Sequence, residues 1–268
     1  MVIVGTSGYS YADWRGPFYP AGLPQREMLA FYASQFAAVE LNYTYYRMPE
    51  ARSLAAMVER TPGAFEFCVK AFRGMTHEVP TNADEVAAVF DRFRSALEPL
   101  CESRRLGCVL LQFPWAFRPT KDSANYLRRC TELLQPLPAV VEFRHSSWVA
   151  DRVRPRLAAL LTELGLGYCC VDEPPLKTLM PPVVIAAAEP GYVRLHGRNT
   201  RKWWQHKEAS ERYDYLYSRP ELEEWATKIS HLDRQMAKTY VFFNNCHAGQ
   251  AATNARTMLE LLAEEPSA

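Results

Sequence analysis

The sequence predicts an α/β protein that forms a single (β/α)8 TIM-barrel-like domain over residues 1–268. Three observations lead to this prediction. Eight short apolar segments have the character of β-strands, and segments with helical spacing of apolar residues separate most of them. No low-complexity segment or linker divides the chain. Alternation of strands and helices is typical of a parallel sheet, and eight such units favour closure into a barrel.

The expected strands are rich in β-branched and aromatic residues, which suit a pleated and half-buried backbone. Glycine, proline or polar residues follow most of them, as expected where a strand ends. The eight segments are residues 2–4, 39–41, 65–70, 108–112, 140–143, 168–172, 192–196 and 240–243.

Helices are expected where apolar residues recur every three or four positions. These segments are residues 28–36, 54–58, 86–97, 126–134, 153–164, 222–229 and 249–262. The proline-rich segment 174–190 fits neither a helix nor a strand. An open, doubly wound sheet is the alternative architecture, but no GxGxxG motif follows the first strand to support a dinucleotide-binding fold.

The composition is that of an ordinary globular protein, with 48% hydrophobic and 23% charged residues. A net charge of +1 gives no bulk electrostatic reason to expect binding to nucleic acid or to a membrane. The sequence shows no signal peptide and no segment long enough to span a bilayer, so we expect a cytoplasmic location. Seven cysteines without a CxxC pair indicate reduced thiols rather than a disulfide framework. The sequence carries no signal for an oligomeric state.

Polar side chains recur at the ends of seven expected strands, always in the phase opposite the bulky apolar residues. Side chains alternate between the two faces of a strand, so Glu142 and Arg144 share one face. The inward-facing set is expected to be Glu40, Asn42, Lys70, Gln112, Glu142, Arg144, Asp172, Arg194, His196 and Asn244. Active sites of TIM barrels lie at this end of the strands. A structural polar plug is the alternative, although buried charges rarely stabilise a fold better than apolar packing.

The mixture of cations, amides and carboxylates in this set suits a small anionic or polyhydroxylated ligand. Glu142 or Asp172 is expected to transfer protons, with His196 as a partner. The residues expected to bind the substrate are Glu40, Asn42, Lys70, Gln112, Arg144, Arg194, Arg198 and Asn244. The sequence therefore predicts an enzyme with hydrolase or lyase chemistry on a phosphate- or carboxylate-bearing substrate.

The sequence supports a metal site less well than an anion-binding site, and it does not define a cofactor. His196 is alone among the histidines in the inward phase, whereas zinc sites usually collect several histidine or cysteine ligands. We therefore assign no metal ligand. A divalent cation such as magnesium, held by glutamate and aspartate, is the alternative.

Residues 198–207 combine several cations with Trp203 and Trp204. A lid packed by its own tryptophans is the favoured interpretation of this loop. The alternative is a nucleic-acid-binding protein or a nuclease, because single-stranded nucleic acid is bound by stacking on aromatic rings and by contacts to phosphate. A third interpretation is a non-catalytic binding module on the same barrel.

Several motifs together resemble the DUF72 family, also called the YecE-like family. They are Gly5-Thr6-Ser7-Gly8-Tyr9 with Trp14, Val39-Glu40-Leu41-Asn42, Thr76-His77, Val141-Glu142-Phe143-Arg144-His145 with Trp148, Tyr192-Val193-Arg194-Leu195-His196-Gly197-Arg198, Arg212-Tyr213-Asp214-Tyr215, and Phe243-Asn244-Asn245 with Asn254. The resemblance covers nearly the whole chain. It implies a TIM-barrel-like fold, in agreement with the strand pattern, and it supplies no reaction, because the family is defined as a domain of unknown function.

Overall fold

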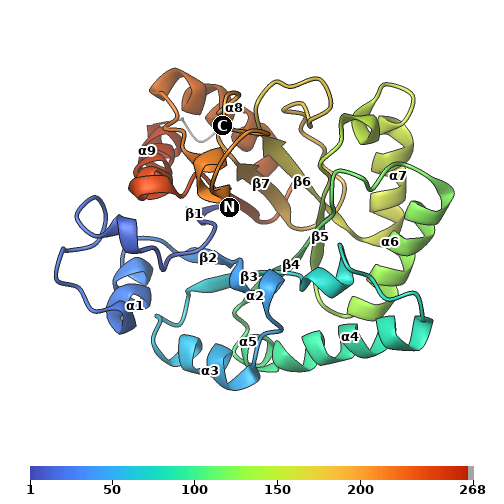
Figure 1. Cartoon of the computed structure of the whole chain (residues 1–268), viewed down its shortest axis with the longest axis horizontal. Helices are drawn as coiled ribbons and strands as arrows, with labels where there is room; N and C mark the ends of the chain where they lie inside the picture. The colour runs from blue at the N-terminus through green and yellow to red at the C-terminus, as the bar shows by residue number, and fades with distance from the viewer. Residues whose placement is uncertain (265–268) are drawn as a thin grey trace.

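The computed structural model describes residues 1–264 and confirms the predicted barrel. Eight strands pair in parallel in the order β1-β8-β7-β6-β5-β4-β3-β2 and curve into a nearly closed barrel (Figure 1). The strands are β1 (Val2–Thr6), β2 (Ala38–Leu41), β3 (Glu66–Lys70), β4 (Leu106–Gln112), β5 (Ala139–Glu142), β6 (Gly167–Asp172), β7 (Gly191–Leu195) and β8 (Thr239–Phe243). Each of them overlaps one of the segments predicted from the sequence.

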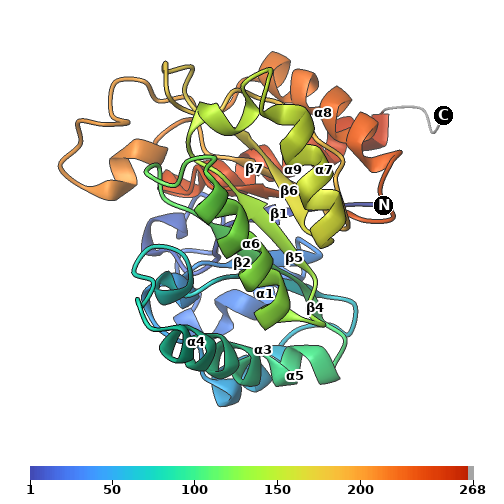
Figure 2. The ribbon, with the colours of Figure 1, turned by 90° about the vertical axis from the view of Figure 1, so that its right-hand side faces the viewer.

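Helices surround the strands, as the alternating pattern predicted (Figures 1 and 2). They are α1 (Met28–Ala33), α2 (Tyr43–Tyr46), α3 (Ala51–Glu59), α4 (Ala83–Ala96), α5 (Glu98–Glu102), α6 (Lys121–Leu134), α7 (Arg154–Leu164), α8 (Arg219–Asp233) and α9 (Gln250–Glu264). Local sequence explains several of the ends. Asn82 caps α4 by accepting from two backbone N–H groups, Ser218 begins α8 in a capping box, and Gly165 ends α7 at φ 64°.

The connection between β6 and β7 departs from the alternating pattern, because residues 173–190 contain no helix. Proline has no backbone N–H and clashes with a preceding helical turn, so a segment with several prolines does not sustain a helix. Met180 and Ile185 of this connection are buried and join the hydrophobic core. The connection therefore covers the barrel through individual apolar side chains.

The barrel closes between β1 and β2 without a regular ladder of hydrogen bonds. Ser7 and Glu40 form an isolated parallel bridge, in which the backbone N–H of Gly8 donates to the carbonyl oxygen of Glu40 at 2.8 Å. The backbones approach so closely below this bridge that a Cβ atom on Gly5 would lie 2.2 Å from the carbonyl oxygen of Ala38. We call this junction the β1–β2 seam.

The hydroxyl group of Tyr32, from α1, supplies part of the missing pairing at the seam. It accepts a hydrogen bond from the backbone N–H of Thr6 at 2.8 Å and donates one to the carbonyl oxygen of Ala38 at 3.2 Å. Tyr32 is fully buried, so both backbone groups are satisfied without water. In the part of the chain that the structure describes, no helix has the length and apolar character needed to cross a membrane.

Candidate functional site

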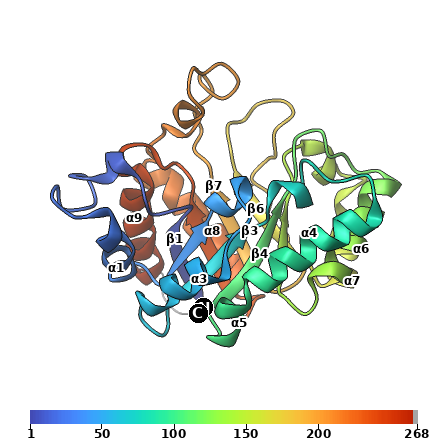
Figure 3. The same ribbon diagram turned by 60° about the horizontal axis from the view of Figure 1, so that its bottom comes forward.

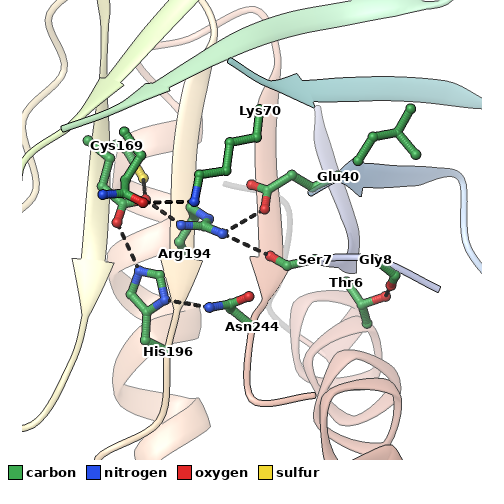
Figure 4. A network of polar contacts seen from close by, with 12 residues as sticks. Thr6, Ser7, Gly8, Glu40, Lys70, Cys169, Arg194, His196 and Asn244 are labelled. Carbon is green, nitrogen blue, oxygen red and sulfur yellow. Dashed lines mark hydrogen bonds and ion pairs between the residues drawn. The ribbon is translucent and has the colours of Figure 1, made fainter. Parts of the chain in front are cut away.

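Arg194 of β7 lies at the centre of a buried polar network near the carboxyl ends of the strands (Figure 4). Its Nη1 donates to Glu142 Oε2 at 2.6 Å, and its Nη2 donates to Glu40 Oε1 at 2.7 Å. Nη2 also lies 3.4 Å from Ser7 Oγ. One guanidinium group thus joins β7 to β5, to β2 and to the end of β1 across the interior of the barrel.

Glu142 is fully buried and contacts three of the predicted site residues. Besides its bond to Arg194, its Oε1 lies 3.2 Å from Arg144 Nη1 and 3.2 Å from His196 Nε2. Burial alone raises the pKa of a carboxyl group, but the charges around Glu142, Arg194 foremost among them, hold its pKa well below the ordinary 4.5. Glu142 is therefore ionised at neutral pH and acts as the counter-ion of the arginines.

His196 is also fully buried, between Glu142 and Asn244. The side-chain amide of Asn244 lies 2.9 Å from Nδ1 of His196, and its NH2 group donates there, so the ring proton lies on Nε2 and points at Glu142. Burial, with a contribution from the charge of Arg144, lowers the pKa of His196 to about 3. The imidazole is therefore neutral at physiological pH and held in one tautomer.

Lys70, at the end of β3, has a different electrostatic environment. Its Nζ donates to Gln112 Oε1 at 2.8 Å and lies 4.6 Å from the centre of the Tyr45 ring. Burial, and next the positive charge of Arg194, lowers the pKa of Lys70 to about 7. Both the protonated and the neutral amine are therefore populated near neutral pH.

Arg144 follows β5 and pairs with Glu173, which the sequence reasoning missed. Arg144 Nη1 donates to Glu173 Oε2 at 2.8 Å, and the other oxygen of Glu173 accepts the backbone N–H of Met180 at 2.9 Å. Burial raises the pKa of Glu173 to about 7, against the opposing charge of Arg144. Glu173 thus belongs to the same network as Glu142, on the neighbouring strand end.

Asp172 does not lie where the sequence pattern placed it. Its carboxylate contacts Arg198, with Nε and Nη2 each at 2.9 Å, and accepts from the hydroxyl of Tyr217 at 2.6 Å. The side chains that face the barrel interior here are instead those of Cys169 and of Glu173, which follows the strand. Sγ of Cys169 lies 3.8 Å from Glu142 Oε2. The expectation was wrong because β6 has no clear contrast between bulky apolar and polar positions.

Arg198, expected to bind substrate, is likewise outside the central network. Besides Asp172 it pairs with Glu221 and Glu224 of α8, at 3.3 and 3.6 Å. Asp172, Glu173 and Arg198 line a separate cavity of about 430 Å³ under the proline-rich connection. The positions of Asp172 and Arg198 favour a role in attaching the β6–β7 connection and α8 to the barrel.

A cavity of about 610 Å³ opens above the central network, and we call it the mouth cavity. Six of the predicted residues line it: Asn42, Lys70, Gln112, Arg144, Arg194 and Asn244. Glu40, Glu142 and His196 do not line it, because they are fully buried beneath its floor. The structure therefore brings together nine of the predicted site residues and separates them into a lining and a buried layer.

Trp203, in the loop 198–207, is buried beside this cavity. The loop belongs to the connection between β7 and α8, drawn in orange, which projects from one end of the barrel (Figure 3). Trp203 is 2% exposed, and its ring lies 5.7 Å from the guanidinium carbon of Arg144 and 5.4 Å from that of Arg212. Trp204 is 55% exposed. This packing favours the lid interpretation over a surface on which both rings stack with bases.

Two residues with signals in the sequence were not assigned to the site. Ser7 belongs to the Gly5-Thr6-Ser7-Gly8 motif that carries part of the family resemblance, and its side chain contacts Arg194. Glu173 follows Asp172 directly, and the phase of Cys169 would have indicated it. Among residues 1–264, the structure shows no group of three or more histidine, cysteine, aspartate or glutamate side chains arranged to hold a metal ion.

Comparisons with known proteins agree with this architecture. Residues 3–268 match the model of the family described as "Protein of unknown function DUF72". The UPF0759 protein YunF of Bacillus subtilis (strain 168) is 34% identical over 98% of this chain and 95% of its own length. A DUF72 family protein from Thermotoga maritima MSB8 is 40% identical and superposes with a TM-score of 0.89, over 98% of this chain and 100% of that one. A DUF72 family protein from Enterococcus faecalis V583 is 26% identical, with a TM-score of 0.87 over 99% and 96% of the two chains. The fold, the match along the whole chain and these relatives show that the chain belongs to the DUF72 family.

Proposed function

We propose that this protein is an enzyme that binds a small phosphate- or carboxylate-bearing substrate in the mouth cavity and exchanges a proton with it, in a hydrolase or lyase reaction. The observation that carries the proposal is the separation of charge at the cavity. Lys70, Arg144 and Arg194 line it, and the carboxylates that also line it, Asp13 and Glu208, form no ion pair with these cations among the described residues. The carboxylates that neutralise the two arginines, Glu40, Glu142 and Glu173, are absent from its lining.

This arrangement supports anion binding because the cations are already desolvated and oriented. Glu142 holds Arg144 and Arg194 from below, so that neither guanidinium has to be immobilised when a ligand arrives.

The proton-transfer role moves from Glu142 and Asp172 to Lys70 in this proposal. Glu142 and His196 are each held in one protonation state near neutral pH, by the arginines and by burial respectively. Lys70 lines the cavity, and its pKa of about 7 lets it accept and release a proton at physiological pH. Asn42, Gln112 and Asn244 line the same cavity and would orient the substrate through their amides.

The proposal is tested in two steps with the full chain. Inorganic phosphate and a panel of small carboxylates are titrated against the wild type by calorimetry, and Arg144→Gln and Lys70→Met are compared with the surface control Arg219→Gln. Saturable binding that both cavity variants lose and the control keeps supports the site. A panel of anionic esters and cleavable acids is then screened for turnover. Absence of anion binding overturns the proposal, and binding without any turnover identifies a binding module instead.

A further inference from the structure

We infer that Nζ of Lys70 is a nucleophile that forms a Schiff base with a small aldehyde or ketone carrying a carboxylate or phosphate group. The inference rests on the function proposed above and selects its lyase branch, because it names the carbonyl group as the reacting part of the substrate. It assigns one wall of the mouth cavity to the amine and the neighbouring wall to the anionic group.

The orientation of Gln112 leaves the lone pair of the amine unoccupied. Nε2 of Gln112 donates to the carbonyl oxygen of Phe113 at 2.7 Å, which fixes the amide so that its Oε1 faces Lys70. Oε1 is only an acceptor, so Lys70 must donate to it. A neutral amine has two N–H groups and one lone pair. The contact with Gln112 uses one N–H, and the lone pair stays available.

The surroundings of Lys70 favour the neutral, nucleophilic amine over the ammonium ion. No carboxylate forms an ion pair with Nζ of Lys70 among the described residues, in contrast to Lys238, whose Nζ lies 2.6 Å from Glu66 Oε1. Burial disfavours a positive charge on Nζ, and Arg194, which lines the same cavity, repels such a charge as well. Lysines activated in this way, by desolvation and a neighbouring cation, attack carbonyl groups.

Arg144 and Arg194 complete the site because they provide a place for the anionic end of the substrate. Both line the cavity with Lys70, and the positive charge of each guanidinium group attracts a carboxylate or a phosphate. A substrate anchored there would present its carbonyl carbon to the amine as part of the same small molecule. Anchoring of this kind converts the attack into an intramolecular step.

The step balances without an oxidant or a reductant. The lone pair of the neutral amine attacks the carbonyl carbon, a C–N bond forms, and the carbonyl C–O bond breaks. One hydrogen from the nitrogen and one proton from the solvent leave with the oxygen as water, and the product is a protonated imine. The N–H that the imine retains can keep the hydrogen bond to Gln112 Oε1. The iminium group then withdraws electrons from the adjacent carbon, which assists loss of a proton or cleavage of a C–C bond there.

Reductive trapping tests the inference on the full chain. The protein is incubated with glyoxylate and sodium cyanoborohydride near pH 7, and the modified lysines are located and quantified by peptide mass spectrometry. We expect Lys70 to be modified at least about tenfold faster than the matched control Lys238, because only Lys70 combines a neutral amine with an anion-binding wall. Inorganic phosphate should slow the modification of Lys70 and leave that of Lys238 unchanged.

The Lys70→Arg variant separates this inference from the function on which it rests. Arginine keeps a cation in the cavity, so phosphate binding measured by calorimetry should persist, while trapping at this position disappears. Modification of Lys70 no faster than that of Lys238 in the wild type overturns the Schiff-base inference. If the wild type still binds phosphate in that case, the anion-binding site stands. If it does not, both proposals are wrong.

Discussion

Replacing Arg194 by methionine is the most direct test of how the interior of the barrel is held together. The substitution keeps a long side chain but removes the cation that Glu40 and Glu142 share. Both carboxylates are fully buried, so solvent does not replace the lost partner. Removing one partner of a buried ion pair costs about 3–5 kcal/mol, because a charge is left uncompensated.

We expect the free energy of unfolding to fall by about 4 kcal/mol. This is less than the sum of two broken ion pairs, because each carboxylate keeps another contact. Glu142 keeps Arg144 at 3.2 Å, and Glu40 keeps the hydroxyl of Tyr192 at 2.7 Å. In the wild type the low pKa of Glu142 contributes stability above about pH 4.5, which is lost as the pH falls through the folded-state pKa. In the variant Glu142 takes up a proton at higher pH, because Arg194 no longer lowers its pKa. The difference between the two proteins should therefore narrow as the pH falls from 7 toward 5.

Urea denaturation followed by tryptophan fluorescence and far-ultraviolet circular dichroism measures the free energy of unfolding at both pH values. Arg219→Met is the control, because Arg219 pairs with Glu223 and Glu264, which are exposed on the surface. We expect the control to lose less than about 1 kcal/mol. An equal loss in Arg194→Met and the control, or a loss independent of pH, would refute the reasoning.

Three further predictions follow from individual side chains. Glu173 has a pKa raised to about 7, so the wild type loses stability as the pH rises from about 4.5 to 7. The free energy of unfolding of Glu173→Gln, measured by urea denaturation, should rise by roughly 3 kcal/mol relative to that of the wild type between these two pH values. A difference between the two proteins that stays constant over this pH range would contradict the prediction. Gly5→Ala should lower the free energy of unfolding by at least about 2 kcal/mol, because the new Cβ atom meets the carbonyl oxygen of Ala38 at the seam. The control Gly22→Ala places a Cβ atom in open space and should change the free energy of unfolding by less than about 1 kcal/mol. A bound anion raises the pKa of Lys70, so phosphate affinity measured by calorimetry should fall by up to about tenfold per pH unit above pH 7. A flat profile would show that Lys70 is not in contact with the anion.

Much of the fold was predictable because its determinants are local in the sequence. Short β-branched runs and the residues that end them marked all eight strands, and Gly165 marked the end of α7. The β6–β7 connection was not predictable, because its prolines give no periodicity and its conformation depends on how Met180 and Ile185 enter the core. The weak closure at the β1–β2 seam also escaped prediction, since it depends on the hydroxyl of Tyr32 from a different segment.

The candidate site was predictable to the extent that strand phase decides it. The alternation of Glu142 with apolar neighbours placed it correctly in the interior, whereas Asp172 was misplaced because its strand lacks that contrast. Glu142 and Arg144, which the sequence placed on one face of the strand, do form an ion pair at 3.2 Å. The shortest contact of Glu142 is with Arg194, 52 residues away along the chain, at 2.6 Å. Pairing across a barrel depends on strand tilt and register, which no local pattern contains.

The β1–β2 seam couples the mouth cavity to local opening of the barrel. The backbone carbonyl of Glu40 accepts the bond from Gly8 that closes the seam, while its carboxylate binds Arg194 in the floor of the cavity. Opening of the seam would therefore separate Glu40 and Ser7, which both contact Arg194. The amide hydrogens of Thr6 and Gly8 are natural reporters of this opening, because Gly8 bonds directly across the seam and Thr6 bonds to the Tyr32 hydroxyl that bridges it. Slower deuterium exchange at these two amides on addition of phosphate would show that a ligand in the cavity keeps the barrel closed.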